Sequence, residues 1–179
     1  MIGIPISVPF GGVAGYALLQ RRMDDNLAQV ARAPQVTRKL QYFRDNIRNA
    51  DSPEALMGDY RLAKMVLTAY GLGEEIGKKA FVEKVMEQGT DDPNSFANRL
   101  RDHRFQAMAK GVGFGNIGGS RTLFNKFKDE IEQGYLQQTL EEAVGASDDG
   151  LRLALNFQRR IGSIASGGAV ENGGWFQIM

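Results

Sequence analysis

The glycine-rich run of residues 113–118 and the histidine ten positions before it are the most obvious candidates for chemistry. The run reads Gly-Phe-Gly-Asn-Ile-Gly. This G-x-G-x-x-G spacing binds a dinucleotide when it directly follows a strand, because the next helix then points its N-terminus at the pyrophosphate. Here the preceding segment has a helical pattern, so a flexible linker between helices is the better interpretation. His103 needs a partner placed in space for acid–base catalysis, and a histidine that packs or faces solvent at a helix start is the plainer interpretation.

Two acidic pairs could suggest a divalent cation. They are Asp91-Asp92 and Asp148-Asp149. Neither pair has the spaced oxygen ligands of a calcium loop, whereas aspartates commonly accept hydrogen bonds from the free amides at a helix start. We therefore expect both pairs to cap helices.

The sequence also contains a near repeat whose two copies begin 43 positions apart. Each copy opens with Asp, an aromatic residue or His, Arg and an apolar residue, continues to a methionine, and closes with Gly-apolar-Gly. We expect the two aspartates to cap helices or to bridge to neighbouring elements. An alternative is that the polar residues converge in space to bind a small molecule. The copies run from Asp59 through Arg61 to Gly71-Leu72-Gly73, and from Asp102 through Arg104 to Gly113-Phe114-Gly115.

Helical periodicity extends over nearly the whole chain, since apolar residues recur at spacings of three and four. Ser52-Pro53 and Asp92-Pro93 are start signals, and Ser120 is expected to cap a long helix closed by Gly145. The pattern predicts that Tyr60 lies on the buried stripe of the third helix. It likewise places Leu123 and Phe124 on the buried stripe of the long helix. The expected helices cover residues 13–33, 35–47, 53–70, 74–88, 93–100, 102–111, 121–144 and 148–161.

Composition excludes several classes of site. The 179-residue chain has no cysteine and one histidine, which excludes disulfides, thiolate metal sites and a histidine-rich metal site. The formal net charge is +1, but residues 21–48 hold seven basic and three acidic side chains, and residues 101–128 hold six and one. Residues 129–150 hold seven acidic and no basic side chains. This alternation is typical of solvated faces that attract one another, and it does not favour nucleic-acid binding.

The first twenty residues carry no charged side chain, yet we expect neither a spanning helix nor a signal peptide there. Pro5 and Pro9 with several glycines break a helix, and no basic residue precedes Arg21. We expect an apolar arm that folds onto the domain. An arm that docks on a partner, or that acts as an export signal, is the alternative.

Several segments resemble one bacterial family of unknown function, number 1217 in the domain-of-unknown-function series. The most specific is Asp92-Pro93-Asn94-Ser95-Phe96-Ala97-Asn98-Arg99-Leu100, and the others are Ala63 to Gly71, Lys79-Ala80-Phe81 with Lys84-Val85, and Leu151 to Arg159. Genes of this family are often found among flagellar genes. The resemblance implies a flagellar connection and carries over no catalytic residue or cofactor. Family members tend to continue past a Trp-Phe-x-Ile-Met segment such as Trp175 to Met179, so we also expect a longer parent protein.

Together these observations predict a single all-α domain of about six to eight helices with an N-terminal apolar arm. We expect an arm with two outer helices over 1–50, a helical core over 51–166 and a glycine-rich tail over 167–179. The expected function is non-enzymatic protein interaction in flagellum assembly or regulation, in the cytoplasm or at the flagellar apparatus. No catalytic, metal or cofactor residue is assigned, and neither nucleic acid nor a membrane span is expected. The alternative is a small-molecule-binding or enzymatic domain that uses Arg61, Arg104, His103 and nearby carboxylates. A weaker alternative is a structural part exported through the flagellar secretion apparatus.

Overall fold

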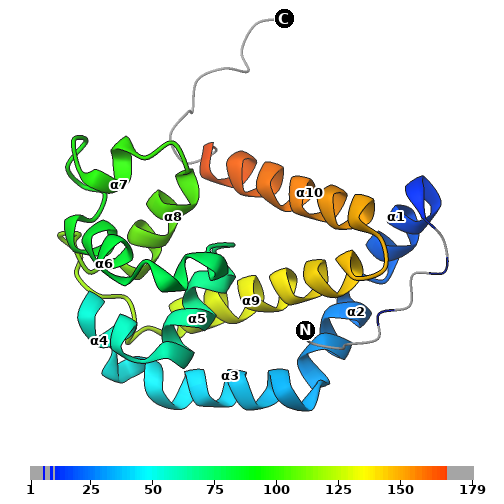
Figure 1. The fold of residues 1–179 in the computed structure, drawn as a ribbon, viewed down its shortest axis with the longest axis horizontal. Coiled ribbons are helices and arrows are strands. Elements are labelled where there is room, and N and C mark those ends of the chain that lie inside the picture. Colours follow the sequence, from blue (N-terminus) through cyan, green and yellow to red (C-terminus); the bar gives the residue numbers. More distant parts are fainter. Residues whose placement is uncertain (1–5, 7–8, 10, 169–179) are drawn as a thin grey trace, which may run out of the picture. The chain divides into compact units, whose positions relative to one another are not determined.

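The fold is built from α-helices joined by short turns (Figure 1). The computed structural model describes residues 6, 9 and 11–168, with side chains through residue 159. No strand occurs in that part of the chain, which confirms the predicted all-α class. The elements are α1 (Gly12–Arg21), α2 (Met23–Arg32), α3 (Pro34–Asn46), η1 (Ile47–Asn49), α4 (Pro53–Gly58), α5 (Tyr60–Ala69), η2 (Gly73–Gly77), α6 (Lys79–Gln88), α7 (Phe96–Arg99), α8 (His103–Val112), α9 (Asn125–Gly145) and α10 (Asp149–Gly168), where η marks a 3₁₀ helix.

The chain divides into two compact units. The large unit comprises Leu27–Thr139, and the small unit joins Met1–Asn26 to Leu140–Met179. The predicted segments 1–50, 51–166 and 167–179 follow the sequence pattern and stay a prediction. Most of the expected N-terminal arm and of the tail lies outside the described residues, although Ile6 of the arm is buried.

The core of the large unit is organised around α5, which contacts α3, α4 and η2. Leu67 of α5 and Phe127 of α9 are both fully buried. Gly134 of α9 faces the carbonyl oxygen of Ala69, and a Cβ atom at Gly134 would lie 2.9 Å from that oxygen. The absence of a side chain at this position therefore allows the two backbones to approach closely.

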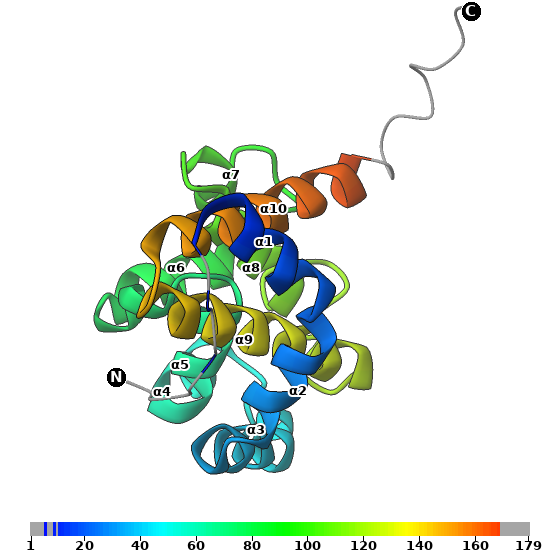
Figure 2. The same ribbon diagram turned by 90° about the vertical axis from the view of Figure 1, so that its right-hand side faces the viewer.

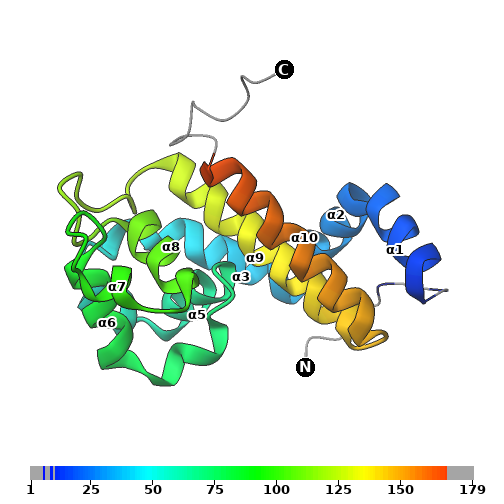
Figure 3. The ribbon, with the colours of Figure 1, turned by 90° about the horizontal axis from the view of Figure 1, so that it is seen from above.

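A second cluster in the large unit joins α6, α7 and α8, which lie together in Figure 3. The ring of Phe81 meets Phe96 edge to face at a centroid distance of 5.3 Å and Phe105 at 5.1 Å. Such pairs add about 0.5–1.5 kcal/mol to the burial of the rings. One aromatic side chain of α6 thus fixes both α7 and α8.

The small unit packs α1 against α10, and the two helices lie side by side in Figure 2. Leu19 of α1 and Leu151 and Leu155 of α10 supply buried apolar side chains. The end of α9 adds Glu141, a buried carboxylate. Its charge is compensated within the unit, as described below.

Several predicted helix boundaries are confirmed. Ser52 accepts a hydrogen bond from the amide of Ala55 at 3.1 Å and caps α4. Gly71 follows the end of α5 with φ of +73°, and Gly113 ends α8 with φ of +81°. Both values lie in the left-handed region that favours glycine.

Other boundaries were predicted wrongly, and the expected helix of residues 53–70 is the clearest example. It is broken at Asp59, whose side chain starts a new helix by accepting bonds from Arg61 and Leu62. The break shifts the helical phase, so Tyr60 is 64% exposed rather than buried. Breaks of this kind, at Arg22 as well as at Asp59, give ten α-helices in the described chain where six to eight were expected.

The start of the long helix was also predicted wrongly. Ser120 does not cap it, because its hydroxyl bonds Thr122 at 2.9 Å and α9 begins only at Asn125. Thr122 is buried, and the amide of Phe124 donates to the carbonyl of Arg121 in a turn. Residues 121–124 therefore form a turn before the helix, and Leu123 and Phe124 are not on its buried stripe.

Candidate functional site

The glycine-rich run forms a closed loop after α8. Gly113 terminates the helix, and the amide of Arg121 donates to the carbonyl of Val112 at 2.9 Å, which brings the two ends of the loop together. Within the loop, the amide of Gly119 donates to Asn116 at 2.8 Å. The element before the loop is a helix, so the strand that a dinucleotide site requires does not precede it.

The tip of this loop is bonded to the turn after α6. The amide of Ile117 donates to the carboxylate of Asp91 at 2.7 Å, and the amide of Thr90 donates to the side-chain oxygen of Asn116 at 2.7 Å. The backbones of Gly89 and Gly115 approach so closely that neither position has room for a Cβ atom. We call residues 89–91 with 115–117 the loop clasp. The amide of Ile117, which a bound phosphate would need as a donor, already donates to the carboxylate of Asp91. The glycines therefore allow the loop to pack closely and do not bind a phosphate.

Asp102 and Arg104 are occupied in joining α8 to the end of α5. Asp102 caps α8 by accepting a bond from the amide of Arg104 at 3.1 Å, and its carboxylate also accepts from the Arg104 guanidinium. That guanidinium donates to the carbonyl of Gly71 as well. The hydrogen bond that the Arg104 guanidinium donates to Asp102 raises the pKa of Arg104. His103 is exposed at the first position of α8.

Asp59 and Arg61 form a comparable arrangement at the start of α5. Asp59 caps the helix, and its second oxygen accepts a hydrogen bond from the hydroxyl of Tyr42 at 2.6 Å. That bond, followed by burial, raises the pKa of Tyr42. The guanidinium of Arg61 lies over the Tyr42 ring, with its central carbon 3.8 Å from the ring centroid. The predicted capping role of the repeated aspartates is thus confirmed at both positions.

The two copies of the repeat do not converge on one site. Asp59 and Arg61 lie at the start of α5, whereas Arg104 bonds Gly71 just past the end of the same helix. A ten-residue helix is about 15 Å long, so roughly that distance separates the two sets of polar groups. What the copies share is the chemistry that starts and stops a helix.

Only the second acidic pair lies at a helix start. The cap expected at Asp91-Asp92 was predicted wrongly, because Ser95 caps α7 and Asp92 closes a turn before it. Asp92 accepts from the amide of Asn94 at 2.8 Å, and Asp148 accepts from the amide of Leu151 at 3.0 Å. Asp149 pairs with an arginine one turn later on α10. Within the described residues, no group of three or more His, Cys, Asp or Glu side chains could hold a metal ion.

The acidic segment 129–150 is largely neutralised by arginines within each unit. In the large unit, Arg44 binds both oxygens of buried Glu132 at 2.5 Å. In the small unit, Arg159 donates to Glu141 at 2.7 and 3.4 Å, and Asn156 adds a bond at 3.1 Å. These pairs agree with the attraction expected from the alternating charge of the sequence.

Two pairs of large apolar side chains remain exposed. In the large unit they are Leu123 and Phe124, 59% and 58% exposed. In the small unit they are Leu153 and Phe157, 55% and 66% exposed and one turn apart on α10. We call them the turn pair and the α10 pair. Neighbouring apolar side chains exposed to this extent are typical of interaction surfaces.

Comparison with known proteins identifies the family. The sequence model of the protein family of unknown function DUF1217 matches residues 69–179. The chain belongs to this family. A crystal structure of an Agrobacterium tumefaciens protein, a structural genomics target, is 34% identical to this DUF1217 chain, with a TM-score of 0.78. The match covers 87% of this chain and 70% of the Agrobacterium one. Among curated proteins, none matches the chain.

Sequence reasoning missed the turn pair of this DUF1217 protein because it extended a helical stripe through Leu123 and Phe124. It also missed the separate start of α5, although Gly58-Asp59 resembles the cap signals recognised elsewhere in the chain. No helix in the part of the chain that the structure describes is long and apolar enough to cross a membrane.

Proposed function

We propose that this DUF1217 protein is a non-enzymatic protein-interaction domain, and that its partner belongs to the flagellum assembly or regulatory machinery. The flagellar part of the proposal is supported by the family resemblance in the sequence. The interaction part is supported by the side chains left exposed. The protein would act in the cytoplasm or at the flagellar apparatus.

The observation that carries the proposal is the α10 pair. Leu153 and Phe157 are four residues apart, so they stand on one side of α10, opposite the flank that buries Leu151 and Leu155. A helix that carries apolar anchors at this spacing can dock its exposed face in a groove of another protein. Burying the exposed half of each side chain in a partner would contribute about 1 kcal/mol to the free energy of binding. Docking would bury neighbouring surface as well.

The polar candidates support the same proposal because they are engaged in holding the fold. Asp91 binds an amide of the loop clasp, while Asp59 and Asp102 cap helices. Arg104 joins two elements. Substituting any of these residues should therefore lower the stability of the fold, because each of them makes structural hydrogen bonds.

A cross-linked pull-down from motile cells tests the proposal. We expect the tagged full-length protein to enrich one or two flagellar components over a tag-only control. Leu153→Ser with Phe157→Ser should abolish that enrichment. Glu142→Gln, an exposed change near the end of α9 in the same unit, should leave it intact.

Two results would contradict the proposal. The first is that wild-type protein recovers no flagellar component, which would reject the flagellar link. The second is that both serine substitutions leave every enriched protein in place while circular dichroism confirms folding, which would reject the α10 pair. A shift in melting temperature with a nucleotide, metal or metabolite would favour the small-molecule alternative.

A further inference from the structure

The start of α5 presents an arginine that is held in place before any partner binds. Tyr42 of α3 donates its hydroxyl proton to Asp59 at 2.6 Å, and Asp59 also accepts from the amides of Arg61 and Leu62 at 2.9 and 3.1 Å. These bonds fix the Tyr42 ring relative to the first turn of α5. The Arg61 guanidinium then lies over that ring, with its central carbon 3.8 Å from the ring centroid. Stacking on an aromatic face is a common way to orient an arginine in an interface.

Arg61 differs from most of the arginines already described in having no carboxylate partner. Arg44 and Arg159 each form an ion pair with a buried glutamate, and Arg104 pairs with its own cap. Within the described chain no ion pair involves Arg61, although its side chain is exposed. An oriented guanidinium that has no carboxylate partner can bind the carboxylate of another protein by donating two parallel hydrogen bonds.

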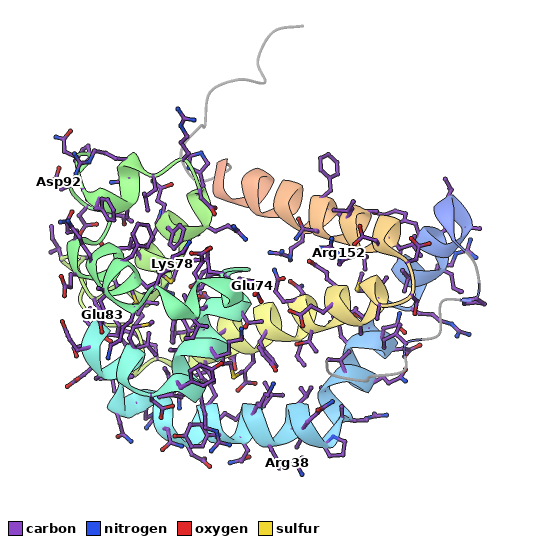
Figure 4. All side chains as sticks on the ribbon, viewed as in Figure 1. Arg38, Glu74, Lys78, Glu83, Asp92 and Arg152 are labelled. Carbon is purple, nitrogen blue, oxygen red and sulfur yellow. The ribbon has the colours of Figure 1, made fainter. Side chains whose placement is uncertain are left out.

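The surroundings of Arg61 add charge and apolar surface. Tyr60, its neighbour in the chain, is 64% exposed. Arg38 lies one turn before Tyr42 and projects from the outer side of α3 (Figure 4), where it is exposed and has no ion pair in the described chain. Tyrosine and arginine, with tryptophan, are the residues that most often dominate binding energy in protein interfaces. We call Arg38, Tyr42, Asp59, Tyr60 and Arg61 the Arg61 platform.

We propose that the Arg61 platform is a docking surface for an acidic segment of a partner protein. A carboxylate of that segment binds the Arg61 guanidinium, and an adjoining apolar side chain packs on Tyr60. Because the guanidinium is already oriented, little side-chain entropy is lost on binding.

The charges favour an acidic protein segment over nucleic acid. Asp59 is itself part of the platform, and Asp45 is exposed on the same side of α3. Two carboxylates among two free arginines would repel a continuous phosphate backbone, whereas a single carboxylate can reach Arg61 alone. The net charge of the chain, +1, provides no broad attraction for a polyanion.

A peptide-binding measurement on the full-length protein tests the inference. The probe is a fluorescein-labelled peptide that carries one glutamate beside one phenylalanine among uncharged residues, and its counterpart carries glutamine in place of that glutamate. We expect Arg61→Lys, which keeps the charge but loses the planar fork, to weaken binding of the acidic peptide about tenfold, as expected for one lost charge-assisted hydrogen bond. Arg48→Lys, at another exposed arginine of the large unit, should leave binding unchanged.

Four results would overturn the inference: no binding of the acidic peptide at millimolar concentration, equal binding of the glutamine peptide, an equal loss in both lysine variants, or tighter binding of a single-stranded oligonucleotide. The inference rests on the proposed function, but the two can fail separately. A cell pull-down in which Arg61→Lys keeps every partner rejects the platform alone. A pull-down in which wild-type protein finds no partner rejects the function, whatever the peptide shows.

Discussion

The substitution Gly115→Ala tests whether the glycine-rich run serves packing. A Cβ atom at this position would fall far inside 3.0 Å of the carbonyl oxygen of Glu87 and the amide nitrogen of Gly89. Both are backbone atoms, so rotation of a side chain cannot relieve the clash. The loop and the turn after α6 would have to separate by roughly 1 Å to restore an ordinary contact.

That separation would disrupt the loop clasp. The bonds from Ile117 to Asp91 and from Thr90 to Asn116 are both 2.7 Å long, and an added ångström stretches them past hydrogen-bonding distance. Loss of one neutral hydrogen bond costs about 1 kcal/mol, and loss of a bond to a carboxylate costs about 1.5–3 kcal/mol. We therefore expect the free energy of unfolding to fall by about 2–4 kcal/mol.

Urea unfolding followed by circular dichroism at 222 nm measures this difference. Gly118→Ala is a matched control in the same loop, because a Cβ atom there meets nothing within 4 Å and the backbone is not left-handed. We expect the control to stay within about 0.5 kcal/mol of wild type. The reasoning is refuted if Gly115→Ala is equally mild, or if both substitutions destabilise the protein to the same extent.

Three further predictions concern buried polar groups. Burial raises the pKa of Tyr70 to about 12, so its contribution to stability is complete below the unfolded pKa of about 10 and is lost as pH rises to about 12. In urea unfolding across that range, the free energy of unfolding of Tyr70→Phe should fall by about 2 kcal/mol less than that of wild type, whereas Tyr60→Phe should behave as wild type. Parallel pH curves for all three proteins would contradict the pKa shift. Gly111→Ala places a Cβ atom against the Tyr70 hydroxyl and should lower the free energy of unfolding by about 1–3 kcal/mol. If Tyr70→Phe recovers none of that loss in a double-mutant cycle, this clash is excluded. Arg159→Met leaves Glu141 buried without its cation and should lower the free energy of unfolding by about 3 kcal/mol at pH 7, whereas a loss under about 0.5 kcal/mol would mean that the pair is solvent-screened.

The helices themselves could be predicted because their signals are local. Ser52 and Asp102 precede their helices in the pattern expected of caps, and Gly71 and Gly113 end them with the left-handed backbone that glycine favours. Each of these features depends on a few consecutive residues, so the sequence alone is sufficient to recognise it.

The errors arose where a local signal interrupted an apolar period. Asp59 caps a new helix in the middle of a continuous apolar stripe, and Thr122 is buried in a turn before α9. In both places the apolar residues beyond the break keep their spacing but change face. Tyr60 and Phe124 were consequently assigned to the core although they are exposed.

The long-range partners could not be predicted at all. Nothing in the sequence indicates that Asp91 reaches the amide of Ile117, or that Tyr42 bonds Asp59 across two helices. Such contacts join residues 17 to 26 positions apart, and they depend on how the helices pack. The alternative that polar residues converge could therefore be examined only with the structure.

Site-specific photo-cross-linking in motile cells tests the central claim, that the α10 pair binds a protein partner, most directly. Benzoylphenylalanine in place of Phe157 should give a discrete cross-linked product that contains a flagellar component, because this side chain is 66% exposed on the proposed docking face. The same probe at Glu142, which is exposed elsewhere in the small unit, should give none. No product at Phe157, or the same product at both positions, would contradict the claim.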